Sequence, residues 1–282
     1  MENTPFQVKS ETQLRGQIWD WRGRGETIGF VPTMGALHAG HLSLITKAKK
    51  HARKIVASIY VNPAQFAKGE DLDTYPRQIQ KDADMLHKAG CDLVYVPSNM
   101  YGQHHATSVN VNGPALGLET DYRPHFFGGV ALIVTKLLNR VQPDIAVFGE
   151  KDYQQLMTIK RLTADLDMPV RIIGAPIVRE DDGLAMSSRN QYFDANGRRI
   201  AGQLNVIMRV CAQNIASGTP IETATNTARN ALLKAGFSSV DYVAVADSRT
   251  LALLSKSPVK GGARLLIAAH CAGVRLIDNC AV

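Results

Sequence analysis

Two histidines three residues apart, His38 and His41, stand in the stretch of sequence best suited to chemistry. They follow an apolar run at 27–31, and Gly40 between them leaves room for a bulky group against the backbone. If a helix begins here, both imidazoles project from its first turn, beside free backbone N–H groups and the positive end of the helix dipole. The pattern predicts a phosphate-binding site. The structural alternative is that His38 caps a turn and His41 packs in a helix.

Two further segments carry side chains of a kind that binds phosphate. Lys151 and Gln155 lie four residues apart, on one face of a helix predicted to follow a buried strand. Ser187, Ser188 and Arg189 offer two hydroxyls and a guanidinium, which can hold phosphate oxygens. Taken alone, the first segment is equally compatible with a solvated helix start, and the second with a surface loop. Together with the histidines, they indicate one nucleotide site.

The elements that position these residues follow from the hydrophobic pattern. In the first two-thirds of the chain, short β-branched apolar runs alternate with segments that have apolar residues at three- and four-residue spacing, which is typical of a parallel sheet covered by helices. Strands are predicted at 27–31, 55–60, 93–96, 145–148 and 170–173. Helices are predicted at 42–51, 76–89, 130–141 and 153–166. Ligands of such open sheets bind beyond the carboxyl ends of the strands, where His41 and Lys151 stand.

The pattern changes after residue 177, where a turn is predicted at 180–183. The elements predicted beyond it are helices at 195–216 and 221–235 and strands at 240–246, 265–269 and 274–277. We therefore expect an α/β fold. A Rossmann-like parallel sheet with helices on both faces forms the first domain, residues 1–177, and a smaller α+β domain covers residues 178–282.

Composition and charge exclude several classes of protein. The 282 residues suit two domains, and 45% apolar with 20% charged residues indicates a folded globular chain. No apolar stretch approaches the ~20 residues that a membrane-spanning helix needs, and no leader pattern precedes residue 6, so we expect a cytoplasmic protein without a membrane partner. The net charge of +7 fits small polyanions, and the lack of a basic tail argues against nucleic acid. The cysteine spacing predicts no protein metal site.

The motifs resemble, in order and over almost the whole chain, those of the pantoate–β-alanine ligases, a family of H-x-G-H nucleotidylyltransferases. The resemblance rests on P-T-M-G-A-L-H-A-G-H at 32–41, V-N-P-A-Q-F at 61–66, Y-P-R at 75–77, V-Q-P-D-I-A-V-F-G-E-K-D-Y-Q-Q at 141–155, D-G-L-A-M-S-S-R-N at 182–190 and R-L-I-D-N at 275–279. It implies an enzyme of pantothenate biosynthesis that uses ATP to join pantoate to β-alanine. A pantoyl adenylate is the implied intermediate, and AMP and pyrophosphate are the implied by-products.

The resemblance also implies the residues of the site. The implied catalytic residues are His38, His41 and Lys151. The implied ATP-binding residues are Met34, Gly35, Ala36, Leu37, His38, Ala39, Gly40, His41, Gly149, Glu150, Lys151, Asp152, Val178, Met186, Ser187, Ser188 and Arg189. Pantoate is expected at Gln65, Gln155, Pro32 and Met34, and β-alanine at Gln65. Mg²⁺ is expected to bind mainly through ATP phosphates, and a homodimer is implied.

One segment departs from the family pattern. Where the family has R-P-G-H-F, this chain has Arg123-Pro124-His125-Phe126-Phe127. The role of the family histidine is therefore not carried over to His125. We expect this segment to form a loop that lines the pocket.

Two other functions are compatible with an H-x-G-H nucleotide site. An adenylyltransferase that joins a nucleotide to a phosphorylated substrate would leave Gln65, Gln155 and the second domain without a role. A nucleotide-binding regulator or an RNA-binding protein without catalysis would be expected to lack one histidine or Lys151. The sequence retains all three of these residues.

Overall fold

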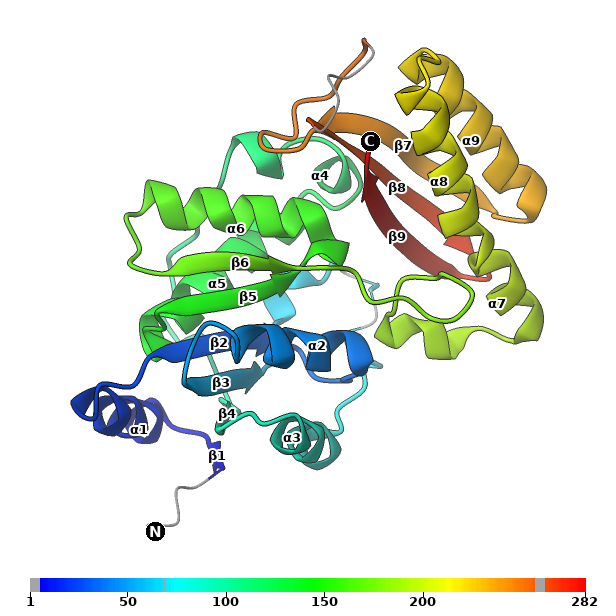
Figure 1. Ribbon diagram of the computed structural model, residues 1–282. Helices are drawn as coiled ribbons and strands as arrows, with labels where there is room; N and C mark the ends of the chain where they lie inside the picture. The colour runs from blue at the N-terminus through cyan, green and yellow to red at the C-terminus, as the bar shows by residue number, and fades with distance from the viewer. Residues whose placement is uncertain (1–5, 68, 71, 257–261) are drawn as a thin grey trace. The chain divides into compact units, whose positions relative to one another are not determined.

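A computed structural model describes residues 6–67, 69–70, 72–256 and 262–282 (Figure 1). The chain divides into two compact units, and each is described by itself. The first comprises Met1–Val111, Arg123–Glu150 and Thr158–Pro176, and the second comprises Asn112–Tyr122, Lys151–Met157 and Ile177–Val282. The second unit thus includes two short segments from the middle of the sequence. A domain boundary after residue 177 stays a prediction.

The first unit is built on a six-stranded sheet in which every pair of neighbouring strands is parallel, in the order β1-β4-β3-β2-β5-β6. The strands β1 to β6 are Gln7–Val8, Ile28–Thr33, Lys54–Ile59, Leu93–Tyr95, Ile145–Gly149 and Arg171–Ala175. The order reverses at β2, which pairs with β3 on one side and β5 on the other. This reversal is the switch point at which open α/β sheets bind their ligands.

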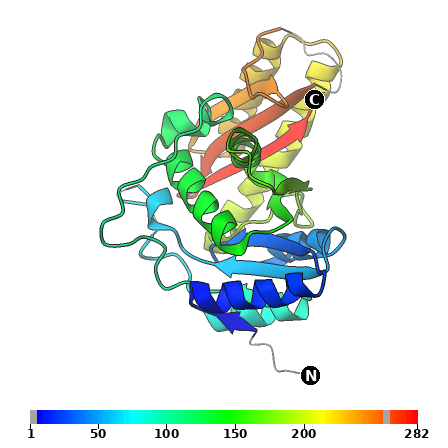
Figure 2. The same cartoon turned by 90° about the vertical axis from the view of Figure 1, so that its left-hand side faces the viewer.

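Helices cover both faces of this sheet, as the sequence predicts. The helices of the first unit are α1 Glu11–Gly23, α2 Ala39–Ala48, α3 Ile79–Lys88 and α5 Phe126–Val141, together with α6 Tyr153–Asp165, which begins in the second unit. Helices α2 and α3 pack on one face, where Leu44 and Leu86 share a core with Ile55. Helices α1 and α5 lie on the other face (Figures 1 and 2). The Rossmann-like parallel sheet is therefore confirmed.

Strand β1 and helix α1 lie outside the predicted elements. Helix α1 is nevertheless encoded locally, because Ser10 and Gln13 form a capping box at its start. Its buried residues Leu14, Ile18 and Trp21 recur at helical spacing and form one apolar stripe.

The second unit contains a three-stranded antiparallel sheet in the order β7-β8-β9. Its elements are α4 Glu119–Tyr122, α7 Ala195–Ala201, α8 Gln203–Ala216, α9 Ile221–Ala235, β7 Ser239–Asp247, β8 Ala263–Cys271 and β9 Val274–Ala281. Leu204 and Met208 of α8 pack with Leu265 and Ile267 of β8 in its core. The small α+β unit is confirmed.

One predicted helix of this unit is wrong. The stretch 195–216 forms two helices that meet at Gly202, not one. Glycine is a poor helix former, and a Cβ at Gly202 would lie 2.9 Å from the Asp182 carboxylate, which would have to shift to make room. Among the described residues, no helix is both long and apolar enough to cross a membrane.

Candidate active site

The turn that follows β2 has an unusual backbone conformation. Gly35 and Ala36 both have positive φ angles, +86° and +52°. The hydroxyl of Thr33 donates a hydrogen bond to the Ser58 carbonyl at 2.7 Å and accepts one from the Gly35 N–H at 3.2 Å. A Cβ at Gly35 would lie 2.9 Å from an oxygen of Asp82, so only glycine fits there.

Asp82 of α3 holds the next part of this turn. Its two carboxylate oxygens accept hydrogen bonds from the N–H groups of Ala36 at 2.9 Å and Leu37 at 3.0 Å. The residue is 2% exposed. Asp82 is not among the site residues predicted from the sequence, although a carboxylate on the buried face of a helix, beside Ala83 and Leu86, is a signal that points to it.

The two histidines lie side by side where α2 begins. Their ring centroids are 4.1 Å apart, and the His38 N–H donates to Nδ1 of His41 at 3.4 Å. Because Nδ1 accepts this hydrogen bond, a neutral His41 carries its proton on Nε2 and presents a donor there. The predicted helix start at the H-x-G-H element is confirmed, since α2 begins at Ala39.

Gln65 ends a short 3₁₀ helix, Pro63–Gln65, that follows β3. Its side-chain oxygen accepts a hydrogen bond from Nδ2 of Asn62 at 2.9 Å, and Tyr101 donates to Oδ1 of Asn62 at 2.6 Å. Asn62 is 1% exposed, and the sequence analysis gives it no role. This arrangement leaves the NH₂ group of Gln65 as the end of the amide that can donate to a ligand.

The segment that departs from the family pattern is not wholly the expected loop, because Phe126 and Phe127 begin helix α5. Its first residue contacts the main chain of Gln65. Arg123 donates to the Gln65 carbonyl at 3.1 Å and to both carboxylate oxygens of Glu70 at 2.9 and 2.7 Å. Burial opposes ionisation of Glu70, but the hydrogen bonds from Arg123 outweigh it, and the pKa of Glu70 is lowered. Nε2 of His125 is buried without a hydrogen-bond partner among the described residues.

In the second unit, Lys151 lies in the 3₁₀ turn Glu150–Asp152 directly before α6. Its ammonium is 3.7 Å from Asp152, and its carbonyl accepts a hydrogen bond from the Asn279 amide at 2.9 Å. Gln155 is half-buried one turn further along. The buried side chain of Gln154 faces the interior of this unit, where its oxygen accepts from the N–H of Glu119 at 3.0 Å.

Val178 and the run 186–189, also predicted to bind ATP, lie on one folded loop of the second unit. The Met186 N–H donates to the Val178 carbonyl at 3.0 Å. The turn predicted at 180–183 is confirmed, because the Gly183 N–H donates to the Glu180 carbonyl at 2.9 Å. Ser187 begins the 3₁₀ helix Ser188–Tyr192, and its hydroxyl accepts from the Arg189 N–H at 3.3 Å.

The structure distributes the predicted site residues over the two units. Pro32, the run 34–41, Gln65, Gly149 and Glu150 belong to the first unit. Lys151, Asp152, Gln155, Val178 and the run 186–189 belong to the second. Within the first unit they gather at one edge of the sheet, because β2 and β5 are parallel neighbours and the turns after both strands leave from that edge. Their binding roles stay predictions.

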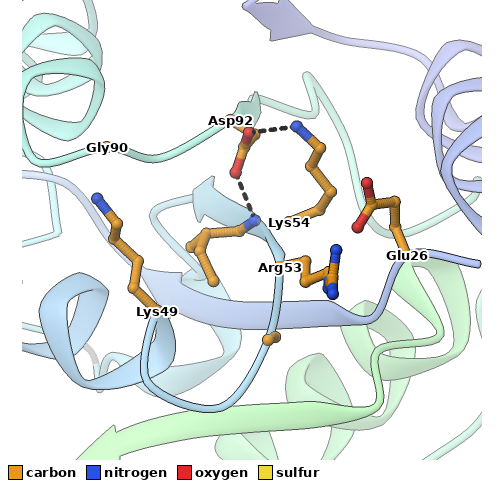
Figure 3. A pocket seen from close by; sticks show the side chains of 8 residues that line it. Glu26, Lys49, Arg53, Lys54, Gly90 and Asp92 are labelled. Atoms are coloured by element: carbon orange, nitrogen blue, oxygen red, sulfur yellow. Dashed lines mark hydrogen bonds and ion pairs between the residues drawn. The ribbon is translucent and has the colours of Figure 1, made fainter.

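A pocket of about 410 Å³ opens at the opposite edge of this sheet, where β2, β3 and β4 begin (Figure 3). It is lined by Glu26, Lys49, Ala52, Arg53, Lys54, Ile55, Gly90 and Asp92. Lys54 is paired with Asp92 at 3.0 Å. None of the described residues that line this pocket belongs to the predicted site.

Sequence comparison places the chain among known enzymes. The family model described as pantoate–β-alanine ligase matches residues 7–281. The pantothenate synthetase of Mesorhizobium japonicum is 50% identical over 277 residues, which cover 98% of this chain and 97% of the relative. That of Caulobacter vibrioides is 46% identical over 282 residues, which cover 99% of each chain.

Solved structures give the same result. Pantothenate synthetase from Thermus thermophilus matches with a TM-score of 0.90 at 40% identity, covering 97% of this chain and 98% of that one. Pantoate–β-alanine ligase from Francisella tularensis, solved in complex with beta-gamma ATP and β-alanine, matches with a TM-score of 0.82 at 32% identity, covering 98% and 97%. Because sequence and fold agree over nearly the whole length, the chain belongs to the pantoate–β-alanine ligase family.

Proposed function

We propose that the chain condenses pantoate with β-alanine in two steps, first forming pantoyl adenylate from pantoate and ATP. Family membership supports the overall reaction, ATP-dependent formation of pantothenate, and the complex of the Francisella relative supports ATP and β-alanine as ligands. The observation that carries the two-step proposal is the pair of histidines at the start of α2, because two neighbouring donors there suit the triphosphate of ATP.

The first step requires charge stabilisation more than a base. The carboxylate of pantoate is already ionised at pH 7, so it can attack the α-phosphorus of ATP directly, and pyrophosphate leaves. His41 donates from Nε2 to a phosphate oxygen in this proposal, beside His38. Lys151 and the run 187–189 surround the triphosphate, while Gly149, Asp152 and Val178 lie beside the nucleoside.

Mg²⁺ fits this site only as an ion held mainly by the phosphates of ATP. Among the described residues, no group of three His, Cys, Asp or Glu side chains gathers to form a cage. The Asp82 carboxylate is engaged by two backbone N–H groups, and Asp152 lies 3.7 Å from Lys151. Few protein ligands are needed when phosphates and water complete the shell, and the bound ion supplies neutralisation of the pyrophosphate charge.

In the second step, the amine of β-alanine attacks the acyl carbonyl, the bond to AMP breaks, and the amine loses a proton as pantothenate forms. Gln65 and Gln155 hold pantoate, and Gln65 also contacts β-alanine. The fixed oxygen of Gln65 supports this role, because its NH₂ group is then oriented toward ligand oxygens. Pro32 and Met34 form an apolar wall for the dimethyl group.

We further propose a homodimer in the cytoplasm.

Pantoate-dependent exchange of labelled pyrophosphate into ATP, with β-alanine omitted, tests the two-step reaction. Exchange is expected with pantoate and Mg²⁺ together and not with either alone, because the adenylate forms reversibly without the amine. A concerted ligase, or an adenylyltransferase for a phosphate ester, gives no exchange under these conditions. Well-folded protein that makes pantothenate but does not exchange pyrophosphate would contradict the adenylate.

His41→Ala tests the phosphate role of the histidine pair. Loss of one preorganised donor should lower the exchange rate by ~10²–10³-fold, with circular dichroism and melting temperature unchanged. The control is His51→Ala, since His51 is exposed just beyond the end of α2. Near-normal exchange in the His41 variant would remove this residue from the mechanism.

Gln155→Ala and Gln65→Ala test pantoate recognition. Each should weaken pantoate binding by ~1–3 kcal/mol, because a buried polar group of the complex loses its partner, and should leave ATP binding nearly unchanged. Titration calorimetry with each ligand measures both effects, and Gln203→Ala on the exposed side of α8 is the control. Weaker ATP binding with unchanged pantoate binding would place these amides in a different subsite.

A further inference from the structure

Strand β9 carries the R-L-I-D-N sequence, Arg275 to Asn279, to which the mechanism gives no role. Its polar residues point to both sides of the strand. Arg275 and Asn279 share one face, because they are four residues apart, and Asp278 shares the other face with Leu276, which is part of the core of the second unit. Each of the three polar side chains bonds a different segment of this unit.

Asn279 contacts the turn that carries Lys151. The Asn279 side chain is 2% exposed, and its Nδ2 donates to the Lys151 carbonyl at 2.9 Å. Its Oδ1 accepts from Nε of Arg264 on β8 at 2.7 Å. Because a donor lies at one end of the amide and an acceptor at the other, the orientation of this side chain is fixed.

Arg275 is linked through Glu119 to Gln154, in the first turn of α6. Two guanidinium nitrogens donate to the two oxygens of Glu119 at 2.7 and 2.8 Å, and Tyr242 donates to the same carboxylate at 2.6 Å. The N–H of Glu119 donates in turn to the side-chain oxygen of Gln154, the residue before Gln155. A bidentate pair buried in this way has little freedom to move.

Asp278 holds the loop that contains Val178 and the run 186–189. Arg179 donates to its two carboxylate oxygens at 2.6 and 3.0 Å and also to the Gly183 carbonyl at 3.0 Å. The side chain of Asp278 is fully buried. Both segments of the second unit that carry predicted ligand-binding residues are therefore bonded to one strand.

We propose that β9 positions the turn 151–155, with Asn279 as the positioning residue of Lys151. The proposal rests on the phosphate role proposed for Lys151. A 3₁₀ turn has poor internal hydrogen bonds, and the ion pair of the Lys151 ammonium with Asp152 is long, at 3.7 Å. A bond from a paired strand to the Lys151 carbonyl therefore sets where this side chain begins. Small misplacement of a charge-stabilising group has large effects on rate.

Asn279→Asp tests this inference, because a carboxylate keeps the acceptor for Arg264 but cannot donate to the Lys151 carbonyl. Pyrophosphate exchange should fall ~10–100-fold, the size expected when a buried hydrogen bond is lost and a catalytic group shifts. Asn226→Asp makes the same change at an exposed position of α9 and should leave the rate unchanged. Asn279→Ala, which removes the donor without adding charge, should give a fall in the same direction.

The same change is then made in Lys151→Ala protein. If Asn279 acts through Lys151, its substitution should change the exchange rate less than about twofold in that background. If Asn279 merely stabilises the fold, its substitution should lower the exchange rate by the same factor in both backgrounds. Equal falls would overturn the positioning role and leave the proposed function intact. Unchanged exchange in Lys151→Ala itself would instead reject the phosphate role of Lys151.

Discussion

Two consecutive backbone N–H groups, those of Ala36 and Leu37, point at one buried carboxylate, and the geometry of the candidate site depends on this contact. The chain must pass from the end of β2 at Thr33 to the start of α2 at Ala39 within a few residues. It does so through two positive φ angles, which leave partly buried N–H groups that need acceptors. Asp82 supplies both acceptors and so fixes where α2, and with it the histidine pair, begins.

The order of the strands places the turn after β2 beside the turn after β5. Because β2 lies at the reversal of the sheet, the turn after β2 and the turn after β5 leave from neighbouring strands. The first unit fixes its turn with a carboxylate that accepts from backbone N–H groups. The second unit fixes its turn with an amide that donates to a backbone carbonyl. In both cases a buried side chain from another element holds the main chain of a turn that carries predicted ligand-binding residues.

Periodicity in the sequence predicts the parallel strands and most helices, because burial on one face leaves a local pattern in each element. It does not predict the residues that hold the turns. Asp82 lies 46 positions from Ala36, and Asn279 lies 128 positions from Lys151, so no local window relates them. The single helix predicted at 195–216 fails at Gly202, a poor helix former that apolar spacing alone does not take into account. Motif resemblance identifies the candidate ligand-binding residues, whereas only the structure identifies the side chains that hold their turns.

The Asp82 carboxylate holds the turn before α2, and we propose that this contact is what places the two histidines for binding phosphate. Its most direct test is the rate of pantoate-dependent pyrophosphate exchange in Asp82→Asn, compared with Asp84→Asn, an exposed aspartate of the same helix that accepts from Gln80. The amide that replaces the carboxylate in Asp82→Asn would accept from only one of the Ala36 and Leu37 N–H groups and would place its own NH₂ donor against the other. We expect this to destabilise the turn by ~1–3 kcal/mol. The account predicts exchange at least ~10-fold slower in the folded Asp82 variant, because a misplaced donor no longer meets the developing charge, and an unchanged rate in the control. A folded Asp82 variant that exchanges pyrophosphate at the wild-type rate would contradict it.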